Sequence, residues 1–234
     1  MGKTLVLAID IAIVAIVAFC SWRGYRNGLI RGAFGVVALV VSLFVANIAA
    51  AAYSEEFTSM LKPFVGGVVE TAIAEMHDED LEYIPEESGH GQETEEFKTA
   101  YTALRQIGLP EPSAVRITEL TVEGGVSGYL ADLIGDNLSS ALAYVAVFGI
   151  AFILLAIIFA VVGNLVGFVF SLPGLKLVDT ITGVLLGLIK GLIIVYTLAV
   201  IIRYFGLVAS STVEETRILK YLINNNPIAG MLGL

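Results

Sequence analysis

The stretches RGYRNGLIRG (residues 23–32) and GVLLGLIKG (residues 183–191) decide the fold that this sequence predicts. In both stretches glycine recurs at every fourth residue beside positive charge. Residues four apart lie on one face of a helix, so each set predicts a groove without side chains. In a bilayer such grooves let helix backbones approach and pack. The glycines are Gly24, Gly28 and Gly32 in the first stretch and Gly183, Gly187 and Gly191 in the second.

Each glycine set also has an alternative interpretation. The first set could form a turn, because glycine tolerates backbone angles that other residues avoid. The second set could line a pore instead of packing against a neighbouring helix. Packing is the interpretation that we carry forward for the second set, and both remain open for the first.

The composition indicates a membrane protein. Of 234 residues, 57% are hydrophobic and 15% are charged, whereas soluble domains are about 45–50% apolar and about 25% charged. The apolar residues gather in four spans, and the first of them, 19 residues long, would extend about 28 Å as a helix, close to a bilayer core of about 30 Å. The sequence therefore predicts an all-α, multi-pass membrane protein with four transmembrane helices. The spans are residues 4–22, 32–53, 139–170 and 178–205.

The spans divide the chain into four parts. Residues 54–138 form an acidic, partly helical insertion with 18 Asp and Glu against four Lys and Arg. Pro63 and Gly66–Gly67 are expected to break its first helix in two, and residues 77–96 are expected to be mobile. The other parts are residues 1–53 with two helices and a basic turn, residues 139–205 with two helices, and residues 206–234 with a short amphipathic helix over 212–223.

The basic turn predicts the orientation. Arg23, Arg26 and Arg31 lie in the short connection between the first two spans and should face the cytoplasm. This places residues 54–138 outside the cytoplasm, and the C-terminus outside as well. Arg203, Arg217 and Lys220 would then lie on the unfavoured side. The arginines of the basic turn are more closely clustered, so we assign the orientation from them.

Three of the charged residues within the apolar spans are candidates for function. From the distance of each residue to the end of its span, we expect Asp10 and Lys190 to lie at similar depth and to form an intramembrane ion pair. A gating or proton-linked role, and solvation of the charges, are the alternatives. Asp179 begins the last span, where we expect it to cap that helix.

Several classes of function find no support in the sequence. Cys20 is the only cysteine, so an intrachain disulfide and a cysteine metal cluster are excluded. We expect no metal site and no cofactor, and the acidic insertion would repel nucleic acid. The chain lacks the G-x-S-x-G, H-E-x-x-H and P-loop motifs, so we expect no enzyme.

The order of these motifs resembles the colicin V production protein (CvpA) family. The family has an acidic residue in the first helix, an arginine-glycine turn after it, and Asp or Asn followed by G-x-x-x-G-x-x-[KR]-G in the last helix. The resemblance covers about residues 4–53 and 139–205, whereas the long acidic insertion departs from the shortest family members. The matching positions are Asp10, Arg23, Gly24, Gly28, Arg31, Asp179, Gly183, Gly187, Lys190 and Gly191.

This resemblance implies a bacterial cytoplasmic (inner) membrane protein needed for production or export of colicin V, without an established chemistry. We therefore expect a non-enzymatic accessory or structural factor for toxin production and envelope function, with the lipid bilayer and an export or envelope protein as partners. The alternative is a small channel or transporter with glycine-lined helices. A single chain of four helices offers few pore-lining faces, so that alternative requires a homo-oligomer.

Overall fold

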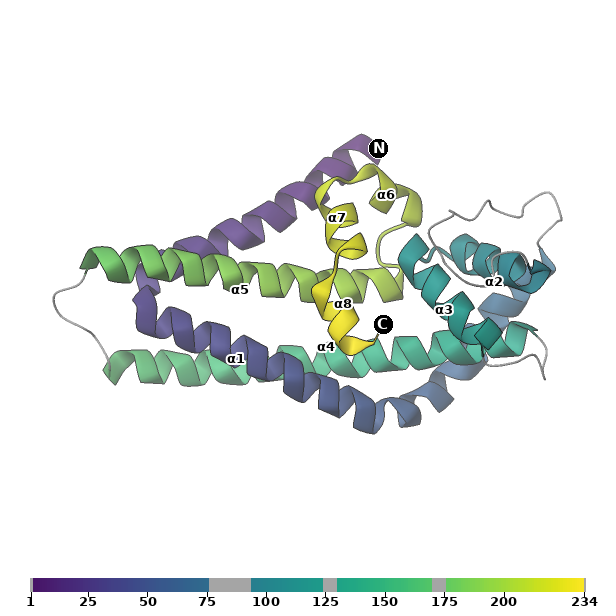
Figure 1. The fold of residues 1–234 in the computed structure, drawn as a ribbon, viewed down its shortest axis with the longest axis horizontal. Coiled ribbons are helices and arrows are strands. Elements are labelled where there is room, and N and C mark those ends of the chain that lie inside the picture. The colour runs from purple at the N-terminus through teal and green to yellow at the C-terminus, as the bar shows by residue number, and fades with distance from the viewer. Residues whose placement is uncertain (1, 76–93, 124–129, 170–175, 234) are drawn as a thin grey trace.

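The computed structural model describes residues 2–75, 94–123, 130–169 and 176–233. Within these ranges the chain is helical and contains no strand (Figure 1). Of residues 77–96, for which mobility is predicted, residues 77–93 lie outside the described ranges, whereas Glu95 and Glu96 form the start of a helix. The helices are α1 (Gly2–Ala74), α2 (Glu95–Gln106), α3 (Glu111–Glu123), α4 (Leu130–Val169), α5 (Lys176–Phe205), α6 (Ser210–Glu215), α7 (Ile218–Asn224) and α8 (Pro227–Leu232).

A bend at Gly28 divides α1 into two arms. Gly28 has φ 71° and ψ −174°, outside the helical region, and a positive φ of this kind favours glycine. The first arm (residues 2–27) and the second arm (residues 29–74) diverge from the bend, which lies near the start of α5 (Figure 1). The N-terminus, α2, α3 and α6 lie toward the opposite end. The basic turn of the sequence is therefore a sharp bend between two long helical arms.

Three of the described helices, α1, α4 and α5, are long and apolar enough to cross a membrane. The outer face of α4 shows why these helices require lipid, since its large apolar side chains are at least half exposed. Soluble proteins rarely expose contiguous apolar patches of this extent. The α4 side chains concerned are Ile150, Ile153, Leu154, Ile157, Ile158 and Val161.

The first arm of α1 and α5 meet backbone to backbone through their glycines. A Cβ atom on Gly24 would collide with the carbonyl oxygen of Gly183, and one on Gly183 would collide with the carbonyl oxygen of Gly24. One on Gly187 would collide with the carbonyl oxygen of Cys20. These contacts pair early residues of one helix with late residues of the other, so the two helices are antiparallel. Gly32 lies beyond the bend and faces the Leu186 side chain, 3.0 Å from the position of an added Cβ.

The second arm continues without interruption through Pro63 to Ala74, so the predicted break at Pro63 and Gly66–Gly67 is wrong. The arm packs against the beginning of α4, where a Cβ on Gly135 would lie 3.3 Å from the Gly66 Cα. Nearby, the Lys62 ammonium lies 2.9 Å from the Asp136 carboxylate. Such tertiary contacts override a local preference against helix. Both helices therefore extend beyond their apolar spans into the acidic insertion.

Helices α2 and α3 cover this end of the bundle. The side chains of Phe97, Leu104 and Ile117 have at most 1% of their surface exposed and pack with Ile134 of α4 and Tyr204 of α5. Arg203 is also buried here, and its Nε donates to the Ser113 hydroxyl at 2.5 Å. Part of the acidic insertion is thus a folded cap that shares the apolar core of the bundle.

The C-terminal segment forms three short helices instead of the single helix expected over residues 212–223. Helix α7 packs between α5 and the first arm of α1, in a core that buries Val195, Leu219 and Ile223 against Ile9 and Ile13. The break between α6 and α7 falls at Thr216 and Arg217. The break is stabilised because the backbone N–H groups of Arg217 and Ile218 donate to the Asp10 carboxylate of α1.

Substitution of Gly187 by alanine tests the glycine contact. Gly187→Ala should lower the stability of the protein in detergent by about 1–3 kcal/mol, because the methyl group collides with a carbonyl oxygen. The matched control is Gly67→Ala, since a Cβ there meets nothing within 4 Å, and it should be neutral or stabilise by up to about 1 kcal/mol. Equal thermal unfolding midpoints for the two variants would contradict the packing.

Candidate functional site

Asp179 holds the bend of α1. It lies in the first turn of α5, and its carboxylate accepts the backbone N–H of Leu29 at 2.6 Å. Leu29 begins the second arm, and the first N–H groups of a helix lack partners within the helix. A carboxylate at a helix N-terminus is also favoured by the helix dipole. Our expectation that Asp179 caps its own helix is therefore corrected: Asp179 caps the second arm of α1.

Gly28 is required beside this cap for two reasons. Its φ is positive, and a Cβ atom on it would lie 2.7 Å from the Cγ of Asp179. A larger residue would strain the backbone and displace the carboxylate. Both interpretations of the first glycine set thus have a place in the structure, since Gly24 packs against α5 and Gly28 forms the turn.

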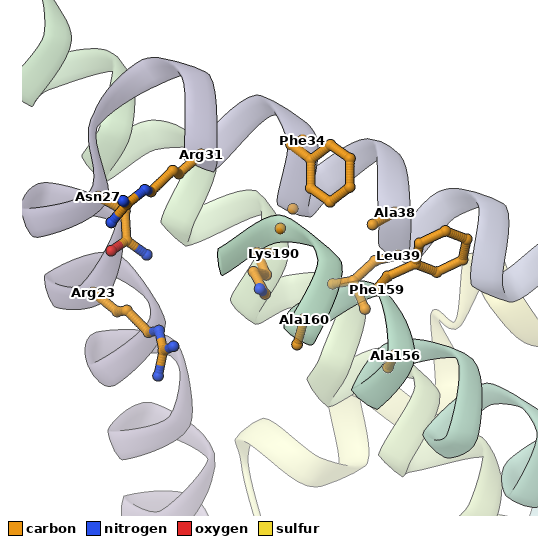
Figure 2. Close-up of a pocket in the computed structure, with 12 residues that line it drawn as sticks. Arg23, Asn27, Arg31, Phe34, Ala38, Leu39, Ala156, Phe159, Ala160 and Lys190 are labelled. Atoms are coloured by element: carbon orange, nitrogen blue, oxygen red, sulfur yellow. The ribbon is translucent and has the colours of Figure 1, made fainter. Parts of the chain in front are cut away.

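A basic cavity lies next to the bend. Its polar lining consists of Arg23, Asn27 and Arg31 of α1 and Lys190 of α5. Figure 2 shows Arg23, Asn27 and Arg31 on one side, Lys190 near the centre, and the apolar side chains on the other side. The volume is about 50 Å³. The remaining lining residues are Phe34, Gly35, Ala38 and Leu39 of α1 and Ala156, Phe159, Ala160 and Gly163 of α4.

The cations of this cavity form no ion pair within the described part of the chain. No Asp or Glu belongs to the lining. The ion pairs that the described residues do form join Lys62 to Asp136, Arg105 to Glu214 and Arg116 to Glu119, all away from the bend. Gly35 makes room for the ammonium group, because a Cβ at Gly35 would lie 3.3 Å from the Lys190 Nζ. The cavity therefore gathers three cations beside an apolar wall.

A second cavity adjoins the first. It has a volume of about 350 Å³ and shares Arg23, Asn27 and Arg31 with the first cavity. Its other lining residues are Phe19, Trp22 and Arg26, and the Arg26 guanidinium lies 5.7 Å from the Trp22 ring centroid. Trp beside Arg is typical of the membrane–water interface. The basic cavity thus continues toward an aromatic rim.

Asp10 and Lys190 do not meet, so the predicted intramembrane ion pair is wrong. The Asp10 carboxylate accepts the backbone N–H groups of Arg217 and Ile218, both at 3.2 Å. It therefore caps α7 at the break in the C-terminal segment. Lys190 lies at the level of the contact between Gly191 and Val17, about 10 Å along the helix from Asp10.

The depth estimate failed because the first arm is longer than its apolar span. We placed the inner end of this helix at residue 22, but the arm continues to the bend at Gly28. The additional turns move Asp10 away from the bend by roughly 9 Å relative to α5. A charged residue within an apolar span is expected to have a functional or structural partner. The sequence does not show which residue that partner is.

Sequence reasoning missed Asn27 and the partners of both carboxylates. Asn27 lies four residues after Arg23 and four before Arg31, and this spacing could have placed it with them. The partners of Asp10 are more than 200 positions away in the chain. The sequence does not show which backbone N–H groups donate to a distant acceptor, so no local signal could have identified these groups.

The Asp10 cap makes a double-mutant cycle informative. Asp10→Ala should cost about 1–2 kcal/mol through loss of the cap, and Asp10→Asn, which keeps an acceptor, should cost less. When Asp10→Ala is combined with Lys190→Met, the losses measured by unfolding in detergent should add within about 0.5 kcal/mol. A coupling energy well above that value would show that Asp10 and Lys190 interact and would contradict the cap as the role of Asp10.

The Asp179 cap predicts a local effect at the bend. Asp179→Ala should increase hydrogen exchange at the amide of Leu29, because that N–H loses its acceptor. Asp132→Ala is the matched control, since Asp132 lies exposed in the first turn of α4. Unchanged exchange at Leu29 in Asp179→Ala would contradict the cap.

Comparison with known proteins identifies the family. The sequence model described as colicin V production protein matches residues 9–76 and 124–227. The match includes the bend, Asp179 and the four polar residues of the cavity, whereas α2 and α3 lie outside it. Comparisons with curated proteins and with solved structures gave no match. With three helices fit to cross a membrane and a match over most of its length, this chain is a helical membrane protein that belongs to the colicin V production protein family.

Proposed function

We propose that this chain is a bacterial cytoplasmic-membrane protein of four crossings that acts as a non-enzymatic accessory or structural factor. Its role would be to support production or export of a colicin V-type toxin and the function of the cell envelope. The family match over the helical core carries this proposal. An export or envelope protein would be its partner, and the folded cap of α2 and α3, which lies outside that match, is the part best placed to meet one.

The positions of the helix ends support four crossings with one orientation. Each arm of α1 would cross once, and α4 and α5 would each cross once. Arg23, Arg26 and Arg31 lie at the bend, whereas α2 and α3 lie at the opposite end of the molecule (Figure 1). Short segments rich in arginine favour the cytoplasmic side. The bend would therefore face the cytoplasm and the cap would face the outside.

The uses of the two intramembrane carboxylates favour a structural role. General acid–base catalysis needs a side chain within reach of a substrate proton. Asp10 and Asp179 instead accept backbone N–H groups at helix ends. Both carboxylates therefore stabilise helix ends within the fold.

The glycine contacts weigh against the channel alternative. Gly24, Gly183 and Gly187 face one another within a single chain, so these faces are occupied before any oligomer forms. A pore through a homo-oligomer would need other faces. The accessory role remains our proposal for this reason.

Cysteine labelling tests the orientation. In a Cys20→Ser background, Glu111→Cys should react with an impermeant thiol reagent in intact cells, because Glu111 is an exposed residue of the cap. Tyr25→Cys, which replaces a side chain that is 55% exposed beside the bend, should react only after the membrane is opened. The reverse pattern would invert the proposed topology.

Complementation tests the role itself. In a colicin V-producing strain that lacks its own family member, this chain should restore toxin release. Gly187→Leu should fail to do so because it disrupts the helix contact, whereas Gly67→Ala should succeed. Restored release by Gly187→Leu at normal protein levels, or ion flux through liposomes containing the purified protein, would contradict the proposal.

A further inference from the structure

The basic cavity at the bend has a feature that helix packing does not explain. Three cations converge from two separate segments of the chain, and none of them has a carboxylate partner among the described residues. Arg23 is exposed and Arg31 and Lys190 are half-buried, so an anion can reach all three side chains. We propose that this cavity binds a phosphate group, which supplies the missing negative charge.

The polar side of the cavity suits phosphate. Arg23 and Arg31 offer planar guanidinium groups that can bind phosphate oxygens in pairs. Lys190 adds a compact positive charge, and Asn27 adds an amide that can donate further hydrogen bonds. The cavity volume of about 50 Å³ exceeds the roughly 10–15 Å³ needed for one water molecule. A small tetrahedral anion therefore fits this side in both charge and size.

The apolar side of the cavity suggests what the phosphate carries. Phe34 and Leu39 of the second arm and Phe159 of α4 line the side away from the arginines (Figure 2). An acyl chain can lie along such a wall, whereas a soluble anion gains nothing from it. The adjoining cavity of about 350 Å³ shares the two arginines and leads toward Trp22, so it offers space for the remainder of a headgroup. An anionic phospholipid and a soluble phosphate share the chemistry of the cavity, and the lipid also matches its apolar half.

A bound phosphate would connect the helical segments that meet at the bend. The cavity residues come from both arms of α1, from α4 and from α5. A phosphate bound to Arg23, Arg31 and Lys190 would bridge the first arm, the second arm and α5. The ligand would therefore stabilise the same arrangement that the Asp179 cap holds from the other side of Gly28. This inference concerns a ligand and does not depend on the accessory role proposed above.

The experiment measures lipid binding to the full chain. The protein is purified in a nonionic detergent, and phosphatidylglycerol, phosphatidylcholine with the same acyl chains, or inorganic phosphate is added. Bound lipid is counted by native mass spectrometry, and the thermal midpoint is followed in parallel. Phosphatidylglycerol should bind and raise the midpoint, because its net negative charge compensates the cavity. Phosphatidylcholine, whose choline would place another cation there, should bind far more weakly.

Variants connect the binding to the cavity. Lys190→Met and Arg31→Gln should each weaken phosphatidylglycerol binding by roughly tenfold or more, and Lys190→Arg should retain it. Arg116→Gln is the control, since it removes one positive charge from α3, where Arg116 pairs with Glu119. If Lys190→Met does not fold, Arg31→Gln against Arg116→Gln decides the question.

Each outcome has one meaning. Displacement of phosphatidylglycerol by millimolar inorganic phosphate, with the same loss in the variants, supports the phosphate site and makes a soluble phosphate its source. Binding that phosphate does not displace supports the site and makes the lipid its source. Equal binding of the two lipids, or unchanged affinity in both cavity variants, would overturn the proposal.

Discussion

The backbone contact between the first arm of α1 and α5 is the interaction on which the rest of the structure depends. Gly24, Gly183 and Gly187 lie so close to the opposite backbone that a single methyl group would not fit. Apolar side chains gain little by leaving lipid for one another, so close packing and polar contacts must hold membrane helices together. The glycine contact sets the antiparallel register of the two helices. That register in turn brings Asp179 to Leu29 and Lys190 to the arginines of the bend.

Backbone groups at helix breaks impose the second constraint. The first N–H groups of a helix have no partner within that helix, and another group must satisfy them. The chain has helix breaks at Gly28 and at Thr216–Arg217, and at each break a carboxylate from another helix accepts such N–H groups. Asp10 and Asp179 therefore each cap the start of a helical segment that packs against their own helix. This gives an intramembrane carboxylate a task that needs neither a cation partner nor a transported proton.

The sequence predicted the helical class and the apolar spans because composition and glycine spacing are local signals. It also predicted that charges within the spans would matter. It failed where the partner was distant, as with Asp10, and where a helix continued beyond its apolar stretch, as at Pro63. The error in the Asp10 and Lys190 depth came from one assumption, that a helix ends where its hydrophobicity ends. The basic cavity was also hidden, because Lys190 lies more than 150 residues after the arginines and meets them only through the glycine register.

The bend concentrates two separate demands for negative charge within a few residues. The N–H groups that begin the second arm call for negative charge, which Asp179 provides at Leu29. The arginines on both sides of Gly28 also call for negative charge, but Asp179 is held by the backbone and no other described carboxylate pairs with them. Removal of these arginines would relieve the repulsion but would also remove the positive charge that, in the proposed topology, orients the protein in the membrane. That topology would therefore leave a surplus of positive charge at the bend, and an anion from outside the chain is the simplest way to balance it.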